Sequence, residues 1–175
     1  MSDMASAIMD AAERRIRGGG FNGFSFRDIA ADVGVKSSSV HYHFPTKEKL
    51  AAAVIRRYTQ EVSELIDQEA KKGGDPVKVW TRAFRGTLNS DDRMCPCVVL
   101  GAGSLELPKE VAAEVKNFFK MCLDKQTASG LSKNGATKLL CTISGALVVA
   151  NALDDLSAYD RATKELIRNS SVLQT

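Results

Sequence analysis

The stretch that decides the fold reads FSFRDIAADVGVKSSSVHYHF and spans residues 24–44. It has Ser25 followed three residues later by an acid, and this spacing predicts a helix with a capping box that runs to about residue 33. Gly34 comes next, and glycine most readily takes the positive φ of a tight turn. A second short helix is expected over residues 37–42. Two short helices joined by a glycine turn predict a helix-turn-helix.

The apolar residues of this stretch are spaced to hold the two helices at a fixed angle. Ala30 gives the small side chain that a close helix crossing needs, and Gly34 follows it by four residues. The apolar side chains that flank the turn are Ile29, Val33, Val35 and Val40. The side chains left to face outward are short hydrogen-bonding, aromatic or basic groups, which suit the major groove of DNA. They are Lys36, Ser37, Ser38, Ser39, His41, Tyr42 and His43.

The rest of the chain is also predicted to be helical. Apolar residues at every fourth position give an amphipathic first helix, which three consecutive glycines end at residues 18–20. Thr46 is placed to cap a long helix from Lys47 to about Lys71. Further helical elements are expected over residues 76–88, 97–107, 108–129, 133–153 and 159–172. The predicted fold is all-α, with a DNA-binding head at residues 1–46 and a larger helical domain at residues 47–175.

Composition and charge fit a protein that binds a polyanion. The 175 residues are 44% hydrophobic and 26% charged, as is typical of a soluble globular protein. The net charge of +3 is carried by the first 60 residues, because residues 61–175 hold fifteen basic and fifteen acidic side chains. Within residues 36–57, five Lys or Arg residues accompany a single acid. A local basic surface of this kind suits DNA.

The head of the chain resembles the DNA-binding head of the TetR (tetracycline-repressor-like) family. The resemblance is carried by residues 24–30 (FSFRDIA), 33–35 (VGV), 39–44 (SVHYHF) and 47–50 (KEKL). It covers about residues 5–55, and Tyr-His-Phe followed by Lys-Glu-x-Leu is its most specific part. The remaining two thirds of the chain are similar only in being helical and of about the right length. Divergence there is expected, since those regions bind different effectors in this family.

The resemblance implies a role for each matching residue of the head. Ser25 and Arg27 are expected to contact phosphates from the start of their helix. Tyr42, His43 and Lys47 are expected to clamp the DNA backbone, and the N-terminus of its own helix assists Lys47. The side chains expected at base edges are Ser37, Ser38, Ser39 and His41. The alternative is a small helical motif without a role in DNA binding.

In TetR-like proteins the C-terminal lobe binds a small molecule and forms the dimer, and the resemblance implies the same here. The last two predicted helices carry a broad apolar face mixed with small residues, which suits a four-helix bundle with a second copy. The residues expected at this interface are Leu139, Ile143, Ala146, Leu147, Ala150, Leu153 and Ile167. The alternative is that these helices pack entirely inside one subunit.

An effector pocket is expected among the fifth to eighth helices. Its candidate lining residues are Trp80, Phe84, Cys95, Cys97, Leu100, Phe118 and Met121. Aromatic residues at helical spacing are equally typical of a packed core.

The two cysteines of Cys95-Pro-Cys97 follow Arg93, and a nearby cation lowers a thiol pKa. The segment is similar to a Cys-bearing segment in TetR-like repressors that sense electrophiles or oxidants. A sensing thiol has to be partly exposed, and the alternative is two small packing residues at a helix start. Cys122 and Cys141 are expected in the core.

Other kinds of site find no support in the sequence. His41 and His43 are two residues apart on a helix and do not face one point, so no metal or cofactor is expected. Nothing sets a nucleophile beside a base, so no enzyme is expected. The longest apolar run, residues 139–153, is interrupted by polar residues and falls short of the ~20 needed to cross a bilayer. With no signal peptide evident, a cytoplasmic protein is expected.

The sequence predicts a homodimeric transcriptional repressor. It binds operator DNA and is released from it by a small-molecule or thiol-reactive effector. One alternative is an activator or architectural DNA-binding protein without an effector. A third class, an enzyme with an incidental helix-turn-helix, needs a convergent polar site in the C-terminal lobe, and the sequence does not show one.

Overall fold

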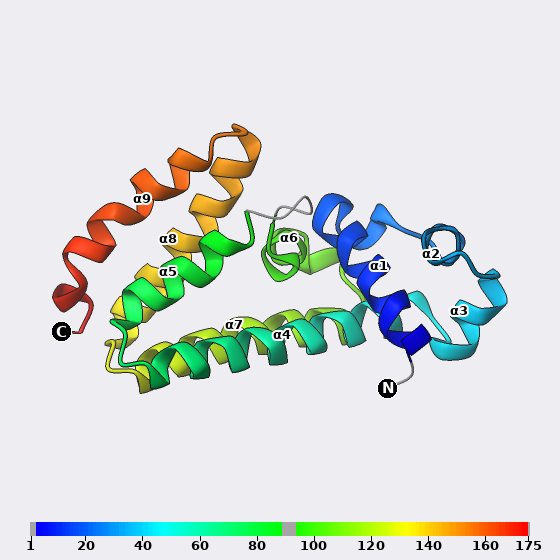
Figure 1. Cartoon of the computed structure of the whole chain (residues 1–175), viewed down its shortest axis with the longest axis horizontal. Coiled ribbons are helices and arrows are strands. Elements are labelled where there is room, and N and C mark those ends of the chain that lie inside the picture. The colour runs from blue at the N-terminus through cyan, green and yellow to red at the C-terminus, as the bar shows by residue number, and fades with distance from the viewer. Residues whose placement is uncertain (1–2, 89–93, 175) are drawn as a thin grey trace. The chain divides into compact units, whose positions relative to one another are not determined.

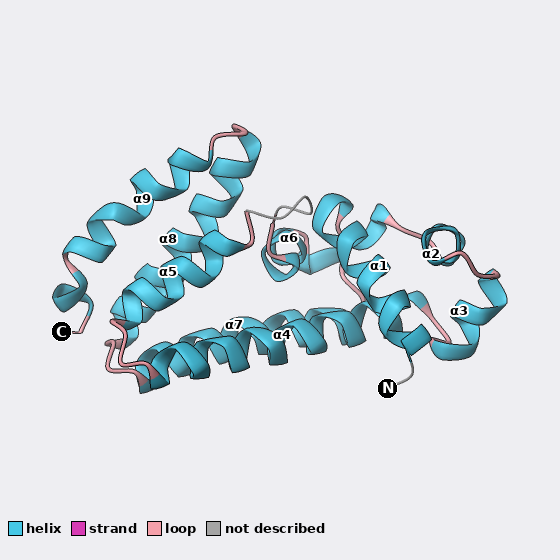
Figure 2. Ribbon diagram, in the orientation of Figure 1, coloured by secondary structure: helices cyan, strands magenta, loops and turns pink. Residues whose placement is uncertain are grey.

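The computed structural model describes residues 3–88 and 94–174, and every regular element in these two ranges is a helix (Figure 1, Figure 2). The α-helices are α1 (Asp3–Gly19), α2 (Phe26–Val33), α3 (Ser37–His43), α4 (Lys47–Lys71), α5 (Pro76–Gly86), α6 (Pro96–Ala102), α7 (Lys109–Ala128), α8 (Lys133–Ala152) and α9 (Leu156–Arg168). Short 3-10 helices follow α1, α6 and α9, at Phe21–Gly23, Ser104–Glu106 and Ser170–Leu173. The all-α prediction is confirmed.

The chain divides into two compact units. The first comprises Met1–Thr59 and Pro96–Phe118, and the second comprises Gln60–Cys95 and Phe119–Thr175. The division therefore falls inside α4, after Thr59, and inside α7, after Phe118. Our division into a head at residues 1–46 and a domain at residues 47–175 follows the expected functions instead, and it stays a prediction.

In the first unit, α2 and α3 form as the local sequence predicts. The Ser25 hydroxyl accepts a hydrogen bond from the Asp28 amide at 3.3 Å, and the Asp28 carboxylate accepts one from the Ser25 amide at 2.8 Å. This capping box satisfies amide groups that have no partner inside the helix. Gly34 ends α2 with a φ of 76°, a left-handed conformation that costs glycine little. The turn is therefore fixed by the sequence itself.

Helix α1 is joined to the first half of α4 by a cluster of charged side chains. The Arg57 guanidinium donates to the Asp10 carboxylate at 2.6 Å and to the Glu13 carboxylate at 3.0 Å. Glu13 also accepts from Arg17 at 2.6 Å. The Arg57 side chain is only 18% exposed, so these ion pairs are shielded from solvent more than ordinary surface pairs. They tie α4 to the helix against which α2 packs.

The second unit is built around α8, which packs on both α5 and α9, and α8 and α9 lie side by side (Figure 1). Asp75 caps α5 by accepting a hydrogen bond from the Lys78 amide at 3.1 Å, and Pro76 occupies the first turn, as the sequence predicts. The Tyr159 hydroxyl donates to the Thr81 carbonyl at 2.8 Å and so links α9 to α5.

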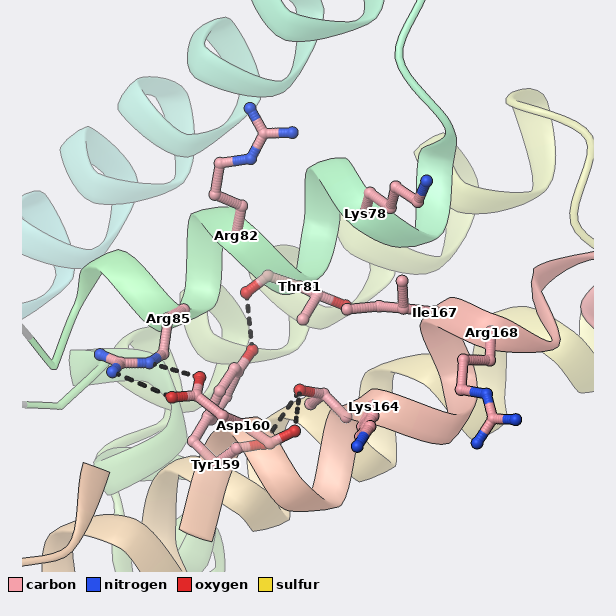
Figure 3. Close-up of a pocket in the computed structure, with 10 residues that line it drawn as sticks. Lys78, Thr81, Arg82, Arg85, Tyr159, Asp160, Lys164, Ile167 and Arg168 are labelled. Atoms are coloured by element: carbon pink, nitrogen blue, oxygen red, sulfur yellow. Dashed lines mark hydrogen bonds and ion pairs between the residues drawn. The ribbon is translucent and has the colours of Figure 1, made fainter. Parts of the chain in front are cut away.

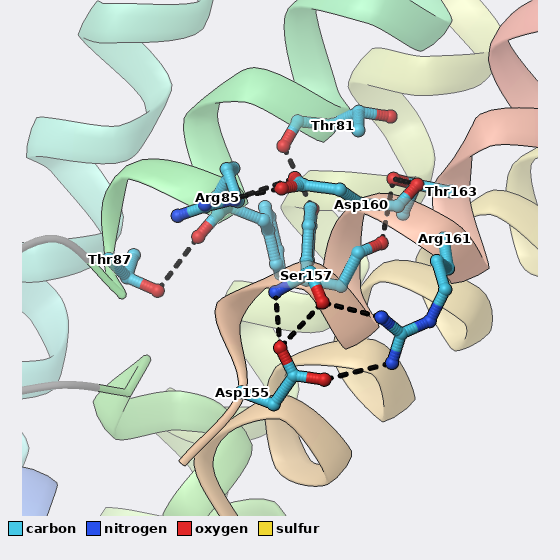
Figure 4. Close-up of polar contacts among 10 residues, drawn as sticks. Thr81, Arg85, Thr87, Asp155, Ser157, Asp160, Arg161 and Thr163 are labelled. Carbon is cyan, nitrogen blue, oxygen red and sulfur yellow. Dashed lines mark hydrogen bonds and ion pairs between the residues drawn. The ribbon is translucent and has the colours of Figure 1, made fainter. Parts of the chain in front are cut away.

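Helix α9 begins at Leu156, three residues before the predicted start. The reason is Asp155, whose carboxylate accepts from the Ser157 amide at 2.9 Å and caps the helix (Figure 4). Hydrogen bonds from Ser157 and Arg161 lower the pKa of Asp155 to about 2. Helix α6 ends at Ala102, five residues before the predicted end. Arg93, the predicted neighbour of the Cys-Pro-Cys segment, lies outside the described residues.

Helix α8 is more apolar than the sequence analysis allowed. Its 20 residues contain a window with a mean hydropathy of 1.3, so the helix is long and apolar enough to span a membrane by length and composition alone. The buried core helix of a soluble protein passes the same test, and 44% of this window is buried inside the chain. Packing on α5 and α9 accounts for the buried part of its apolar surface.

Candidate nucleic-acid interface

Helix α3 presents nearly all of its side chains to the exterior. Only Val40 is buried, and it anchors the helix to the core of the head. Ser38, His41 and Tyr42 are exposed, and Tyr42 is 85% exposed. The half-buried residues of α3 are Ser37, Ser39 and His43. An exposed row of hydroxyl, imidazole and phenol groups on a helix held from behind is the surface that entry into a DNA groove requires.

The rings of α3 are held by neighbouring rings. His41 packs edge-on against Phe26 of α2, with 4.6 Å between ring centroids, and Phe26 itself is buried. Tyr42 and His43 form a second edge-on pair with centroids 5.2 Å apart. These contacts limit the rotamers of His41 and His43 and so reduce the entropy lost when they bind a ligand.

Lys47, the first residue of α4, lies over two aromatic rings. Its Nζ atom is 4.6 Å from the ring centroid of Phe21 and 4.7 Å from that of Phe24. Partial burial is the main cause that lowers the pKa of Lys47 from its usual value. Lys47 was predicted to contact DNA, but this aromatic cradle was not predicted, although the FNGF segment before α2 already carried the two rings. The ammonium group is thereby fixed beside the start of α4.

The hydroxyl of Ser25 has a structural partner. It donates to the Asp28 carboxylate at 2.7 Å, and hydrogen bonds from Ser25 hold the pKa of Asp28 below its usual value. Ser25 is exposed, but a phosphate would have to compete with Asp28 for this proton. Ser25 is therefore a poorer hydrogen-bond donor to a phosphate than Arg27, whose side chain is also exposed.

Three exposed basic side chains of the head, Arg27, Lys36 and Lys49, form no ion pair with any residue that the structure describes. Lys49 was not among the predicted contacts. It lies in the first turn of α4, where the Thr46 hydroxyl accepts a hydrogen bond from the Lys49 amide at 3.2 Å. The KEKL segment could have indicated a DNA contact by Lys49, since two lysines there flank one acid. Positive charge at a helix N-terminus suits a phosphate group.

Comparisons with known proteins agree with this geometry. Residues 8–54 match the family model described as bacterial regulatory proteins, tetR family. A TetR-family transcriptional regulator from Agrobacterium tumefaciens is 26% identical, with a TM-score of 0.85 over 94% of this chain and 95% of that one. A TetR transcriptional regulator from Legionella pneumophila is 24% identical, with a TM-score of 0.86 over 96% and 97% of the two chains. No curated protein matches the chain.

The chain has the DNA-binding domain and the fold of a TetR-family transcriptional regulator. The family model covers the helix-turn-helix, and the structural matches extend over the C-terminal helices as well. The reduced form of E. coli NemR, at 18% identity and a TM-score of 0.76, shares the fold alone. The contact assigned to each residue of the head stays a prediction.

The residues predicted for the effector pocket of this chain do not gather in one compact unit. Trp80, Phe84, Cys95 and Met121 belong to the second unit, whereas Cys97, Leu100 and Phe118 belong to the first. All except the half-buried Met121 are at most 3% exposed, as packed core residues are. Trp80 also lines a cavity of about 440 Å³ with residues of α4 and α7.

A buried glutamine was missed by the sequence analysis. Gln126 of α7 is fully buried, and neither atom of its amide group has a hydrogen-bond partner among the described residues. It follows Phe118 and Cys122 at intervals of four residues, so the signal was a polar residue in the apolar stripe of a helix. A buried amide without partners is costly, so water or a ligand is needed to satisfy it.

The cysteine predictions need correction. Cys95 is 1% exposed and Cys97 is fully buried, so neither meets the condition of partial exposure set for a sensing thiol. Burial also raises the pKa of the Cys122 thiol well above its usual value. Cys141 was predicted in the core but is exposed, because it lies on the side of α8 opposite Leu139 and Ile143. The charge on a thiolate is disfavoured in an apolar interior.

We expect Cys95 and Cys97 to be unreactive in the native protein. A maleimide should label neither of them, nor Cys122, within the time that fully labels all four thiols in denaturant. The measurement is mass spectrometry of peptides from protein that was labelled with and without guanidinium. Rapid native labelling of Cys95 or Cys97, together with loss of DNA binding that Cys95→Ser or Cys97→Ser prevents, would restore the sensing hypothesis.

Most of the predicted dimer face is buried within a single copy of the chain. Five of its seven residues are at most 5% exposed in a single copy: Leu139, Ile143, Ala146, Leu147 and Ala150. Ile167 is half-buried and lines a groove with α5 of the same chain. Only Leu153, at 63% exposed, remains available to a partner. The opposite side of α8 exposes Cys141, Gly145, Val148, Val149 and Ala152; we call these five residues the outer α8 face.

Among the described residues, no group of three or more His, Cys, Asp or Glu side chains is placed to hold a metal ion. His41 and His43 instead contact aromatic rings, as described above.

Replacing Lys47 by alanine should lower the affinity for operator DNA and for random-sequence DNA by the same factor, because a phosphate contact carries little sequence information. The slope of log affinity against log salt should fall by about one unit. Fluorescence anisotropy at several salt concentrations measures both, and Lys120→Ala, an exposed lysine of the second unit, is the control. A loss confined to the operator would contradict the phosphate role.

Proposed function

We propose that this TetR-family protein is a homodimeric transcriptional repressor that an effector releases from a roughly palindromic operator. The observation that supports DNA binding is the exposed outer surface of α3. It is flanked by the capping box of α2 and by the aromatic cradle of Lys47 at the start of α4. The proposed target of this surface is double-stranded DNA, and the proposed place of action is the cytoplasm.

On DNA, the exposed side of α3 enters the major groove. Ser38 and His41 are one turn apart and exposed, so they face the base edges. Tyr42, with its phenol 85% exposed, lies beside them and reaches a phosphate or a sugar. Lys36, Arg27 and the start of α4 contribute positive charge around the groove. Ser37, Ser39 and His43 are half-buried and make secondary contacts.

Dimerisation through the outer α8 face places two heads on one operator. Val148 and Val149 are 48% and 51% exposed, and Leu153 continues the apolar surface at the end of the helix. A contiguous apolar helix side next to two small residues, Gly145 and Ala152, allows close approach of a second helix. The identical face of a second copy is its partner in a twofold arrangement, and the half-sites are then about one helical turn of DNA apart or a multiple of it.

The effector is a reversible ligand of the C-terminal helices. Helix α7 supplies Lys125 and Ala128 to the lining of the Trp80 cavity, and it also carries Gln126, whose side-chain amide has no partner among the described residues. Release from DNA requires that the effector binds the DNA-incompetent conformation more tightly. Helix α4 is the element that transmits the change, since it begins at Lys47 beside the DNA surface and is fixed to α1 by Arg57.

Selection of bound DNA sequences from a random pool tests this function. The wild type should enrich a palindromic motif, and Ser38→Ala or His41→Ala should relax the preference at one or two positions per half-site, at about 1–3 kcal/mol each. Ser171→Ala, an exposed serine in the second unit, should enrich the wild-type motif. Enrichment of no motif by the wild type would overturn the proposed function. An unchanged preference in both head variants would remove these residues from the base-contacting surface.

A further inference from the structure

A groove between α5 and α9 is lined by none of the residues predicted to contact DNA, and of the predicted dimer residues only Ile167 reaches it. Its volume is about 560 Å³, within the range of roughly 300–1,000 Å³ that small-molecule sites occupy. Figure 3 shows that one wall comes from α5 and the other from α9, both in the second unit. The groove therefore has the size of a ligand site and no assigned role.

The floor of this groove is fixed before any ligand arrives. The buried Tyr159 hydroxyl donates to the Thr81 carbonyl at 2.8 Å, and the Thr163 hydroxyl donates to the Tyr159 carbonyl at 2.9 Å. Burial raises the pKa of Tyr159, so its phenol stays protonated and keeps this contact. A rigid floor of this kind lowers the entropy lost on binding.

One polar atom of the floor has no hydrogen-bond partner among the described residues. Thr81 is 5% exposed, and its side-chain oxygen forms no hydrogen bond with any described residue. In Figure 3 the side chains of Thr81 and Ile167 point toward each other between the two helices. Buried hydroxyl groups nearly always have a hydrogen-bond partner. A polar group of a bound molecule would supply it here.

The charges around the groove favour an anion. Its lining holds five cationic side chains and a single carboxylate, that of Asp160. Asp160 is already paired with Arg85, whose Nε atom donates to it at 2.8 Å (Figure 4). This pair neutralises the end of the groove at the C-terminus of α5 and leaves positive charge at the other end.

That other end has two lysines on opposite walls. Lys78 of α5 and Lys164 of α9 form no ion pair with any residue that the structure describes. Two other cations of the lining form ion pairs: Arg82 lies 3.5 Å from the Glu69 carboxylate, and Arg168 lies 2.9 Å from that of Glu165. In Figure 3 the lysine head groups extend outward from the rims. Their flexible four-carbon stems allow them to turn over a bound anion.

We propose that this groove binds a small amphipathic anion, with a carboxylate or phosphate head group between Lys78 and Lys164 and an apolar body against Ile167. The Thr81 hydroxyl gives the ligand its buried polar contact. Neutral ligands gain nothing from the two lysines, and cationic ligands are repelled by them. This site stands independently of operator binding.

Isothermal titration of the full-length protein tests the proposal, with decanoate and decyl phosphate as anionic probes. Decanol tests whether the alkyl chain of the ligand binds without a charged head group, and inorganic phosphate tests whether the head group binds without an alkyl chain. We expect both amphipathic anions to bind, more weakly at higher salt, and the two simpler probes to bind at least about tenfold more weakly. Tighter binding of one anion than the other identifies the head group. No heat from either anion, or equal affinity for decanol, would overturn the proposal.

Charge reversal locates the site. Lys78→Glu and Lys164→Glu should each lower anion affinity about tenfold or more, whereas Lys120→Glu, an exposed lysine of α7, should leave it unchanged. Thr81→Val keeps the side-chain volume and removes the hydroxyl, so it should weaken binding without lowering thermal stability. Equal affinity in all these variants would place the anion elsewhere and overturn the proposal. Operator affinity without ligand is measured in parallel, so a failure of DNA binding is recognised separately.

Discussion

Replacing Val149 by aspartate should convert the proposed dimer to a monomer and lower operator affinity by about 100-fold or more. Val149 is 51% exposed in the single chain, so the change removes no core packing, but it places a charge in the centre of the proposed twofold interface. The loss on DNA is large because the second head binds with a high effective concentration only while it is linked to the first. Sedimentation velocity and operator titration measure the two effects.

Ala113→Asp is the matched control, because it adds the same charge to an exposed position on α7. It should remain dimeric and bind the operator as the wild type does. The exposed thiol of Cys141 gives a second measurement on the outer α8 face: it should react slowly with a maleimide in the wild-type dimer and quickly in Val149→Asp. A dimeric Val149→Asp variant with a wild-type labelling rate would show that the interface lies on another surface.

Reversing the charge of Arg57 should lower the free energy of unfolding by about 3 kcal/mol, the lower end of the cost of breaking a buried ion pair, because the Asp10 carboxylate is 53% exposed. In Arg57→Glu a third carboxylate lies next to those of Asp10 and Glu13, in a place where the side chains of Arg57 and Glu13 are 18% and 14% exposed. The joint between α1 and α4 opens, and the head loses its fixed position on α4. DNA binding should fall together with stability in urea titrations and anisotropy.

The neighbouring residue provides the control. Arg56 also pairs with a carboxylate, that of Glu114 at 2.5 Å, but its side chain is 70% exposed. Arg56→Glu should therefore cost about 1 kcal/mol or less. Similar costs for the two reversals would show that the cluster around Arg57 is solvated and that it does not hold the joint.

The helix-turn-helix was predictable because its determinants are local. The capping box of Ser25 and Asp28, and the left-handed turn at Gly34, are set within a few residues of chain, and the structure has both. The same holds for the cap of α4 at Thr46 and for Pro76 in the first turn of α5. A short-range hydrogen bond or a steric preference of the backbone acts in the same way whatever the rest of the chain does.

The aromatic cradle of Lys47 was not predictable in the same way, although its rings precede α2 by only a few residues. Whether Phe21 and Phe24 turn toward the start of α4 depends on the path of the chain around the head. The cluster that joins Arg57 to Asp10 and Glu13 spans 44 to 47 positions in sequence. From the sequence, Arg57 counted only toward a basic surface at residues 36–57 and had no expected partner, since charge patterns do not show which carboxylate lies across a helix interface.

Amphipathic periodicity identified α8 as a helix with a broad apolar face, but it did not show which side would face the chain's own core. A helix apolar on more than one side has two candidate packing surfaces, and the stripe through Leu139, Ile143 and Leu147 packs within the chain. The outer face through Val148 and Val149 is what remains for a second copy. The exposure of the cysteines was not predictable for the same reason, because it depends on how the helices pack.

The sequence by itself determined the helix-turn-helix, its caps and turn, the positions of most helices, and the similarity to TetR-like proteins, because all of these depend on contacts between near neighbours in the chain. The tertiary structure alone decided the burial of Cys95 and Cys97, the outer face of α8, the burial of the Gln126 side-chain amide away from any partner among the described residues, and the groove between α5 and α9. Each of these arises where helices distant in sequence pack together, and it is that packing which sets which side chains lose water and which keep it.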